Sequence, residues 1–108
     1  MILRKKASEV ELKKLAKHFQ GYIKIVVDVE RKILAGGSDR HVDDEKMLLA
    51  DGSRQMDLWG GGLDLETKEI DYNSIINLRP NQGNPSRDIL DKKIREEFNT
   101  IVRNLLLK

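Results

Sequence analysis

An alternating stretch at residues 22–29 restricts the fold of this chain more than any other feature. Apolar side chains occupy every second position, and charged side chains occupy several of the positions between them. Because successive side chains of a strand point to opposite faces, the pattern predicts a strand with one buried and one solvated face. The buried set is Ile23, Ile25, Val27 and Val29. A polar break at 30–32 and an apolar run at 33–35 then predict a hairpin.

Helical patterns lie on both sides of this strand. Ser8 and Glu11 form a capping box, and Gly21 provides a left-handed stop, so a helix is predicted at residues 8–20. Residues 42–50 predict a short helix, with a strand as the alternative. Asp91 is the predicted N-cap of a last helix. The apolar stripe of that helix is Ile94, Phe98, Ile101, Val102 and Leu105.

Two further strands are predicted in the middle of the chain. The first covers residues 54–65, and its glycines at 60–62 indicate a bulge, a sharp bend or the close approach of another backbone. The second covers residues 70–79 and ends at Pro80, because proline donates no ladder hydrogen bond. The 108 residues therefore predict a single α+β domain. It has a mostly antiparallel sheet of about four to five strands and about three helices, with the first and last helices on one sheet face.

Composition excludes several classes of protein. The chain has no cysteine, which rules out disulfides, thiolate metal sites and cysteine nucleophiles, and favours a cytoplasmic location. Charged residues make up 35% of the chain, but the formal net charge is only +2, which argues against a protein that coats polyanions. No apolar run is long enough to predict a membrane span. Phosphate-binding loops, dinucleotide fingerprints and nucleophile elbows are absent, so no cofactor is expected.

The loop at residues 77–87 is the main candidate for chemistry. It contains two arginines, four carboxamides and a hydroxyl, and no carboxylate. Arginine binds phosphate or carboxylate through two bonds, and the loop leads toward the start of the last helix. The predicted ligand-binding residues are Asn77, Arg79, Gln82, Gly83, Asn84, Ser86 and Arg87, with Trp59. The alternative is a structured loop that bonds its own backbone, with Arg79 and Arg87 paired to Asp71 or Asp88.

A second hypothesis is a divalent metal site formed by His41, Asp43 and Glu45. An imidazole with carboxylates is a competent ligand set, and either a helix or a strand could bring these residues together. The alternative is an acidic first turn of a helix, which the helix dipole favours by itself.

Two other side chains each have two interpretations. Trp59 is either a core anchor, which is favoured in a chain with few aromatic residues, or a platform for stacking. Asp28 is expected to pair with Lys24 on the solvated face of the strand, and a buried catalytic carboxylate is the alternative.

The sequence also resembles a small prokaryotic family that is known as a domain of unknown function. The matching segments are V-D-x-E-R from Val27, G-G-x-x-x-H-x-D from Gly36, D-L-W-G from Asp57 and N-x-R-P-x-Q-G-N-x-S-R from Asn77. The last segment is the most specific of the four. The resemblance extends from the first predicted helix to the last, and it implies a cytoplasmic stand-alone domain without an assigned activity.

Three functional hypotheses follow. The first is a binding module for an anionic ligand, a nucleotide or a nucleic-acid phosphate, at the 77–87 loop. The second is a metal-dependent hydrolase that uses His41, Asp43 and Glu45. The third is a structural or regulatory protein that forms a homodimer through an exposed sheet edge. A cleft that joins residues 41–45 to residues 77–87 would favour the enzyme hypothesis, because arginine, carboxylate and metal together suit phosphoryl transfer, and two distant surfaces would argue against it.

Overall fold

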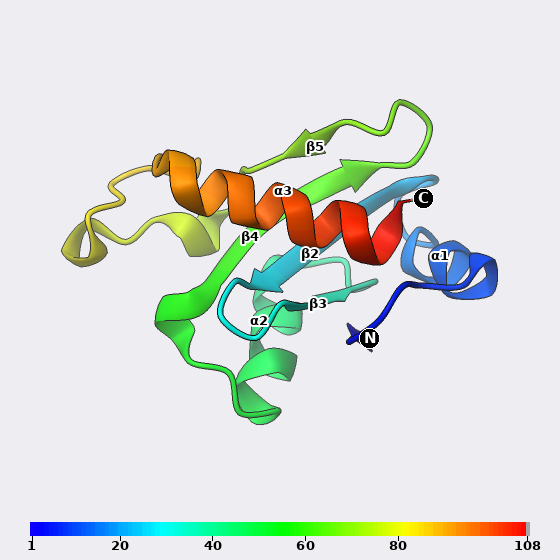
Figure 1. Ribbon diagram of the computed structural model, residues 1–108, viewed down its shortest axis with the longest axis horizontal. Coiled ribbons are helices and arrows are strands. Elements are labelled where there is room, and N and C mark those ends of the chain that lie inside the picture. Colours follow the sequence, from blue (N-terminus) through cyan, green and yellow to red (C-terminus); the bar gives the residue numbers. More distant parts are fainter. Residues whose placement is uncertain (108) are drawn as a thin grey trace.

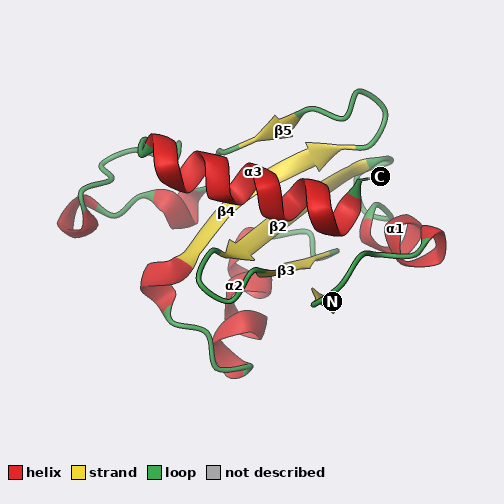
Figure 2. Cartoon of the chain, viewed as in Figure 1, coloured by secondary structure: helices red, strands yellow, loops and turns green. Residues whose placement is uncertain are grey.

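The computed structural model describes residues 1–107, which form a five-stranded antiparallel sheet with three α-helices (Figures 1 and 2). The strand order is β1-β3-β2-β4-β5. The strands are β1 (Ile2–Leu3), β2 (Tyr22–Asp28), β3 (Ile33–Gly36), β4 (Leu58–Asp64) and β5 (Ile70–Asp71). The helices are α1 (Glu9–Leu15), α2 (His41–Ala50) and α3 (Lys92–Leu106), with short 3₁₀ helices at Gln55–Asp57, Ile75–Asn77 and Pro80–Gln82. The α+β prediction is confirmed.

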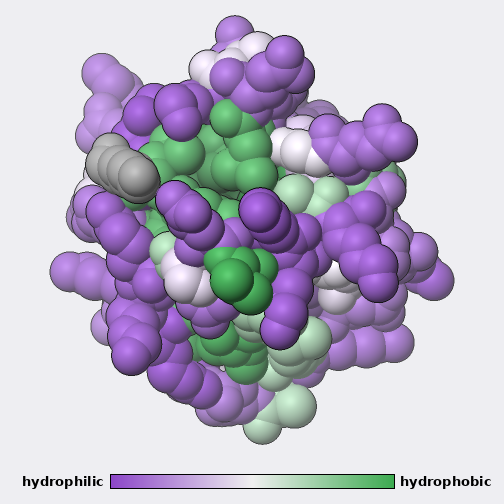
Figure 3. All heavy atoms as spheres, turned by 90° about the vertical axis from the view of Figure 1, so that its right-hand side faces the viewer, coloured by the Kyte–Doolittle hydropathy of each residue, from purple (hydrophilic) through white to green (hydrophobic). Residues whose placement is uncertain are grey.

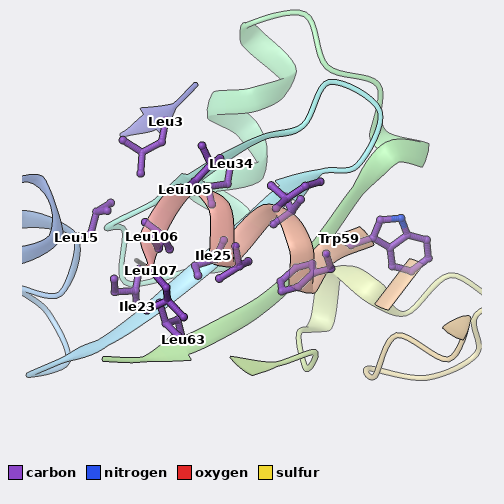
Figure 4. Close-up of a cluster of buried hydrophobic side chains, with 14 of the residues drawn as sticks. Leu3, Leu15, Ile23, Ile25, Leu34, Trp59, Leu63, Leu105, Leu106 and Leu107 are labelled. Atoms are coloured by element: carbon purple, nitrogen blue, oxygen red, sulfur yellow. The ribbon is translucent and has the colours of Figure 1, made fainter. Parts of the chain in front are cut away.

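The helices form layers on both faces of the sheet. In Figure 1, α3 crosses in front of β2 and β4, while α2 lies behind the sheet. The main apolar core contains residues of α1, α3 and one sheet face, among them Leu15, Ile25 and Phe98. The first and last helices therefore cover the same face, as the sequence predicts. Figure 4 shows the leucines and isoleucines of this core gathered together, with Trp59 at one end of the cluster.

The opposite face of the sheet carries a smaller core, which corrects one prediction. Val26, Leu48 and Leu58 pack together between the sheet and α2. Strand β2 is therefore buried on both faces over its second half, although the alternation predicted a solvated face. The expected pair between Asp28 and Lys24 is absent among residues 1–107, because Asp28 is fully buried and its Oδ1 accepts from the amides of the hairpin turn, Glu30 and Arg31.

Three element boundaries also differ from the prediction. Helix α1 ends at Leu15 and is followed by turns, so it covers only part of 8–20. The segment predicted as a strand at 54–65 begins with a 3₁₀ turn, and its strand is 58–64. The segment predicted as a strand at 70–79 pairs only at 70–71. Ser74 then caps a 3₁₀ turn through its side chain, because a serine hydroxyl that accepts from a nearby backbone amide competes with ladder pairing.

The three glycines of β4 allow close approach of other groups and form no bulge. Gly60, Gly61 and Gly62 pair in unbroken register with β2. A Cβ on Gly61 would lie 2.7 Å from the Phe98 ring of α3 and would also meet the Asp71 carbonyl. A Cβ on Gly60 would lie 2.6 Å from Ser74. Because these three positions of β4 carry no side chain, α3 packs closely on one face of the strand and residues 74–77 pack closely on the other.

The outer surface and the sheet edges complete the description. Figure 3 shows the side that carries α1 and the C-terminal end, where hydrophilic residues cover most of the surface. No helix within residues 1–107 combines the length and the apolar character that a membrane crossing requires. The edge strands β1 and β5 are two residues long each, and short edges limit strand addition. The homodimer through a sheet edge stays a prediction.

Candidate functional site

Residues 77–84, called the braced loop below, are held in place by buried side chains. Asn77 is fully buried, and its carboxamide pairs with both backbone groups of Gly60 on β4, at 2.8 and 2.9 Å. The same carboxamide donates to the carbonyls of Tyr72 and Arg87, each at 3.0 Å. One side chain therefore joins the sheet to both ends of the surrounding segment.

Arg79 and Asn84 complete this network. Their backbone groups pair in both directions, which closes a tight hairpin over Pro80–Gln82. The Arg79 guanidinium donates to the carbonyls of Ile76 and Gln55, each at 2.9 Å, and to that of Leu58. The Asn84 side chain is bonded to four backbone groups of residues 77–90. Gly83 adopts φ +77°, which glycine tolerates at the end of the turn.

The braced loop therefore fits the structured-loop alternative, in which polar side chains bond the protein's own backbone, better than it fits an open ligand site. Arg79 is 8% exposed, and its guanidinium lies 4.6 Å from the centre of the Trp59 ring, which is itself buried. The Asn77, Arg79 and Asn84 donors thus have partners inside the protein. Of the predicted ligand residues, Gln82, Gly83 and Arg87 are exposed and Ser86 is partly exposed.

The predicted arginine pairs are not formed among residues 1–107. Asp71 accepts from the Tyr22 hydroxyl, and Asp88 accepts from the Asn73 amide group. Arg79 bonds carbonyl oxygens instead of a carboxylate, because its buried position places three backbone acceptors within reach.

A cleft of about 660 Å³ lies between the start of α2 and the segment that follows β5. Its lining residues come from β2, α2, β5 and the chain before α3. They are Tyr22, Lys24, Arg40, His41, Val42, Asp71, Asn73, Ser74, Ile75 and Arg87. The cleft thus brings Arg87 of the 77–87 loop together with His41 of the predicted metal set.

The glycines of β4 make room for this cleft. Lys24 and Asp71 pair with Gly62 from the two neighbouring strands, so their side chains share one sheet face with it. A Cβ on Gly62 would meet the Tyr22 hydroxyl and would lie 2.8 Å from Asp71 Oδ2. Because Gly62 has no side chain, the groups of β2 and β5 meet across β4.

Three cations face one carboxylate in the cleft. The side chains of Arg40 and Arg87 form no hydrogen bond or ion pair within the part of the chain that the structure describes, whereas the Arg87 carbonyl is held by Ser74 and Asn77. Lys24 Nζ donates to the Asp39 carbonyl at 3.0 Å. Asp71 is the carboxylate of the cleft. The backbone positions of the cations are therefore fixed, while two of their charged groups are open to a ligand.

His41 is the first residue of α2, and its side chain contacts the backbone of β4 at Gly61. Its Nε2 is 2.7 Å from the Gly61 carbonyl oxygen. Burial lowers the pKa of His41 below its usual range and nearby Lys24 acts in the same direction, while the Gly61 contact and Asp71 oppose them. The imidazole is therefore neutral at pH 7, and its Nε2 carries the hydrogen because a carbonyl oxygen only accepts.

Tyr22 and Asp71 also line the cleft, and a hydrogen bond joins their side chains. The hydroxyl donates to Asp71 Oδ2 at 2.6 Å, and burial together with this carboxylate raises the pKa of Tyr22 above its ordinary value. Asp71 Oδ1 accepts from the Asn73 amide. Tyr22 is therefore a fixed phenol and a poor proton donor.

The geometry gives the metal hypothesis no support. Asp43 is exposed on α2 and Glu45 is buried on the same helix, while His41 Nε2 is bonded to Gly61. Residues 1–107 contain no group of three histidine, cysteine, aspartate or glutamate side chains placed to hold a metal ion. His41 remains important for a different reason, its place in the cleft.

Sequence reasoning missed several cleft residues, namely Tyr22, Lys24, Arg40, Asp71 and Ser74. The alternation of β2 already placed Lys24 on the face opposite the main core. Arg40 directly precedes His41, which makes a basic pair before an acidic helix turn. Neither signal predicts that these residues share one cleft, because the pairing of β2 and β5 with β4 brings them together.

Comparison with known families agrees with the extent of this fold. The family described as a protein of unknown function, DUF5674, matches residues 1–105. The chain belongs to this family. No curated protein and no solved structure matches the DUF5674 chain. The family assignment confirms the resemblance at the level of a domain of unknown function, and it assigns no activity to the cleft.

Proposed function

We propose that this DUF5674 chain is a binding module for a phosphate-bearing ligand, and that the phosphate lies in the cleft between Arg40, Arg87 and Lys24. The main support is that Arg40 and Arg87, which are far apart in the sequence, line one cleft and that neither guanidinium group is paired within the described residues. Arginine forks bind phosphate through charge-assisted bonds, which are stronger than neutral ones. The anion site predicted for the 77–87 loop is thus proposed at its Arg87 end.

The start of α2 supports the same placement. Its N-cap residue is Arg40, which provides no side-chain acceptor for the first amides within the described chain. The first amides of a helix have no partner within the helix, and they favour an anion. His41 and Val42, which open α2, line the cleft with the cations.

An NMR titration tests this function. Inorganic phosphate and AMP should shift the amides of His41, Val42 and Arg87 at millimolar concentration, and should leave those of Lys5 and Lys6 unchanged. A diffuse attraction would shift both basic regions and weaken with salt. Unmoved cleft amides with both compounds would overturn the proposal.

A matched pair of variants separates the cleft from general charge. Arg87→Gln should weaken AMP binding by about 10-fold or more, the loss expected for a charged hydrogen bond. Lys93→Gln removes one charge from an exposed position on α3 and should leave affinity unchanged. Equal weakening in both variants would contradict a formed site.

A further inference from the structure

The imidazole of His41 offers a ligand a different kind of contact from the three cations that line the cleft. The cations Lys24, Arg40 and Arg87 are hydrogen-bond donors only. The Gly61 carbonyl holds His41 Nε2 as the protonated nitrogen, at 2.7 Å. In a neutral imidazole the other nitrogen is then an acceptor.

The second nitrogen, Nδ1, is open to solvent. It forms no hydrogen bond with any residue that the structure describes. The buried unpartnered side-chain atoms are oxygens of Asp28, Asp44 and Glu45, and His41 Nδ1 does not belong to this group. Nδ1 is therefore an accessible acceptor on a half-buried side chain of the cleft.

An acceptor among cations selects a particular kind of anion. The phosphate group of a monoester is mainly the dianion at neutral pH, so it has lone pairs to offer to Arg40 and Arg87 but no hydrogen to donate to Nδ1. A ligand with a hydroxyl next to its phosphate satisfies both kinds of group at once. A buried or half-buried polar group without a partner lowers affinity, so the site should discriminate between ligands with and without this hydroxyl.

The cleft also has an apolar part. Ile75 is 55% exposed and lines the cleft together with Val42. An exposed isoleucine beside cationic groups offers a surface for the flat face of a base. This observation favours a nucleotide over a sugar phosphate that carries the same hydroxyl.

We propose that the ligand of this site is a ribonucleotide with a phosphate next to a free ribose hydroxyl, and that this hydroxyl donates to Nδ1 of His41. The inference rests on the proposed function, since the phosphate is placed on the same cations. It goes further by naming the ligand class and the residue that distinguishes ribose from deoxyribose. His41 is a specificity-determining residue in this proposal.

The test compares 3′-AMP with 2′-deoxyadenosine 3′-phosphate by calorimetry or NMR titration. The two differ only in the hydroxyl next to the phosphate, and 3′-AMP should bind about 3- to 10-fold more tightly, the effect of one net hydrogen bond. Equal affinity would overturn the inference and leave phosphate binding standing. Absence of binding by both would overturn the proposed function as well.

A variant locates the discrimination on Nδ1. In His41→Gln the side-chain amide can still donate to Gly61, but it places no acceptor at the Nδ1 position. The variant should bind both nucleotides with the affinity that the wild type has for the deoxy form. Asp43→Asn, on the same turn and exposed, should keep the full discrimination. A preference for 3′-AMP that persists in His41→Gln would overturn the role of His41.

Two further measurements need no variant. Ring ¹⁵N shifts of His41 should show a protonated Nε2 and a bare Nδ1 at pH 7, and the reverse tautomer would overturn the proposal. Glycerol 2-phosphate carries neighbouring hydroxyls without a base, and it should bind more weakly than 3′-AMP. Equal binding would overturn the nucleotide assignment in favour of a base-free hydroxyphosphate.

Discussion

Arg79 in the braced loop and Arg87 in the cleft belong to the same short sequence segment, yet their surroundings are opposite. The Arg79 guanidinium is buried against Trp59 and bonds three backbone carbonyls. The Arg87 guanidinium is exposed and has no partner within residues 1–107, although its carbonyl is held by Asn77. The residue type is the same, so burial and nearby acceptors decide which guanidinium is bonded within the protein and which stays open.

The comparison shows that a conspicuous motif can be architectural. Asn77, Arg79, Gly83 and Asn84 each have a defined role in shaping or fastening the braced loop. The cleft, by contrast, is assembled from residues that are far apart in the sequence. Substitutions in the braced loop should therefore affect stability, and substitutions in the cleft should affect binding.

The largest effect is expected for Asn77→Ala. The substitution leaves both buried backbone groups of Gly60 without their partner, and it removes one of the two donors to each of the carbonyls of Tyr72 and Arg87. Each unsatisfied buried group costs about 1–3 kcal/mol, so unfolding free energy should fall by about 4 kcal/mol in urea melts. Asn81→Ala, exposed in the same loop, is the control and should change it by less than about 0.5 kcal/mol.

A somewhat smaller loss is expected for Arg79→Ala. The carbonyls of Ile76 and Leu58 lose the guanidinium donor, the Gln55 carbonyl keeps only the Leu58 amide, and the buried Glu45 loses the nearby positive charge. Removal of one partner from such a buried arrangement costs about 3–5 kcal/mol, and about 3 kcal/mol is expected here because the donor serves carbonyls. Denaturant melts without added ligand measure it. Unchanged stability would mean that Arg79 is free for a ligand after all.

Asp44→Asn should change stability in a pH-dependent way. Asp44 is fully buried on α2, one of its oxygens has no partner, and burial raises its pKa from 3.8 to about 6 despite the bond from Ser38. The folded state therefore prefers the neutral acid, and this stabilisation is present below about pH 4 and is lost as pH rises to about 6.

The Asn side chain does not ionise, so it escapes this loss. The unfolding free energy of the variant minus that of the wild type should increase by about 2–3 kcal/mol between pH 4 and pH 8. Melts at both pH values measure the difference. A constant difference would show that the Asp44 carboxylate is hydrated in the folded protein.

The smallest effect on stability is expected for Arg87→Ala. Its guanidinium contacts solvent, and surface substitutions of this kind change unfolding free energy by about 0.5 kcal/mol or less. The same variant should lose AMP binding in the titration described above. A loss of stability comparable to that of Arg79→Ala would remove the distinction between the two arginines.

Local patterns in the sequence were sufficient to predict much of the fold. The Ser8 capping box and the Asp91 N-cap are both formed, and the apolar stripe of α3 packs on the sheet as predicted. The alternation at 22–29 predicted β2, and the following run predicted β3. These features depend on residues a few positions apart, so helix and strand periodicity record them directly.

The site was predicted less well for a physical reason. Sequence patterns singled out residues 41–45 and 77–87 as polar clusters, and one predicted site residue of each, His41 and Arg87, lies in the cleft. The order of the strands and the loss of side chains at Gly60–Gly62 decided which members meet. The strand predicted at 70–79 also ends at Asp71, since Ser74 and Asn77 bond the 3₁₀ turn and β4 instead of continuing a ladder.

The sequence by itself determined the helix caps, the central hairpin and the α+β class, because each follows from short-range spacing of apolar and capping residues. Only the tertiary structure decided that α2 covers the second sheet face, and hence that Asp28 and Asp44 are buried. It also decided which of two arginines is enclosed. Hydrogen-bond partners such as Gly60 and Asn77 are 17 residues apart, and no local pattern encodes a contact that exists only once the chain has folded.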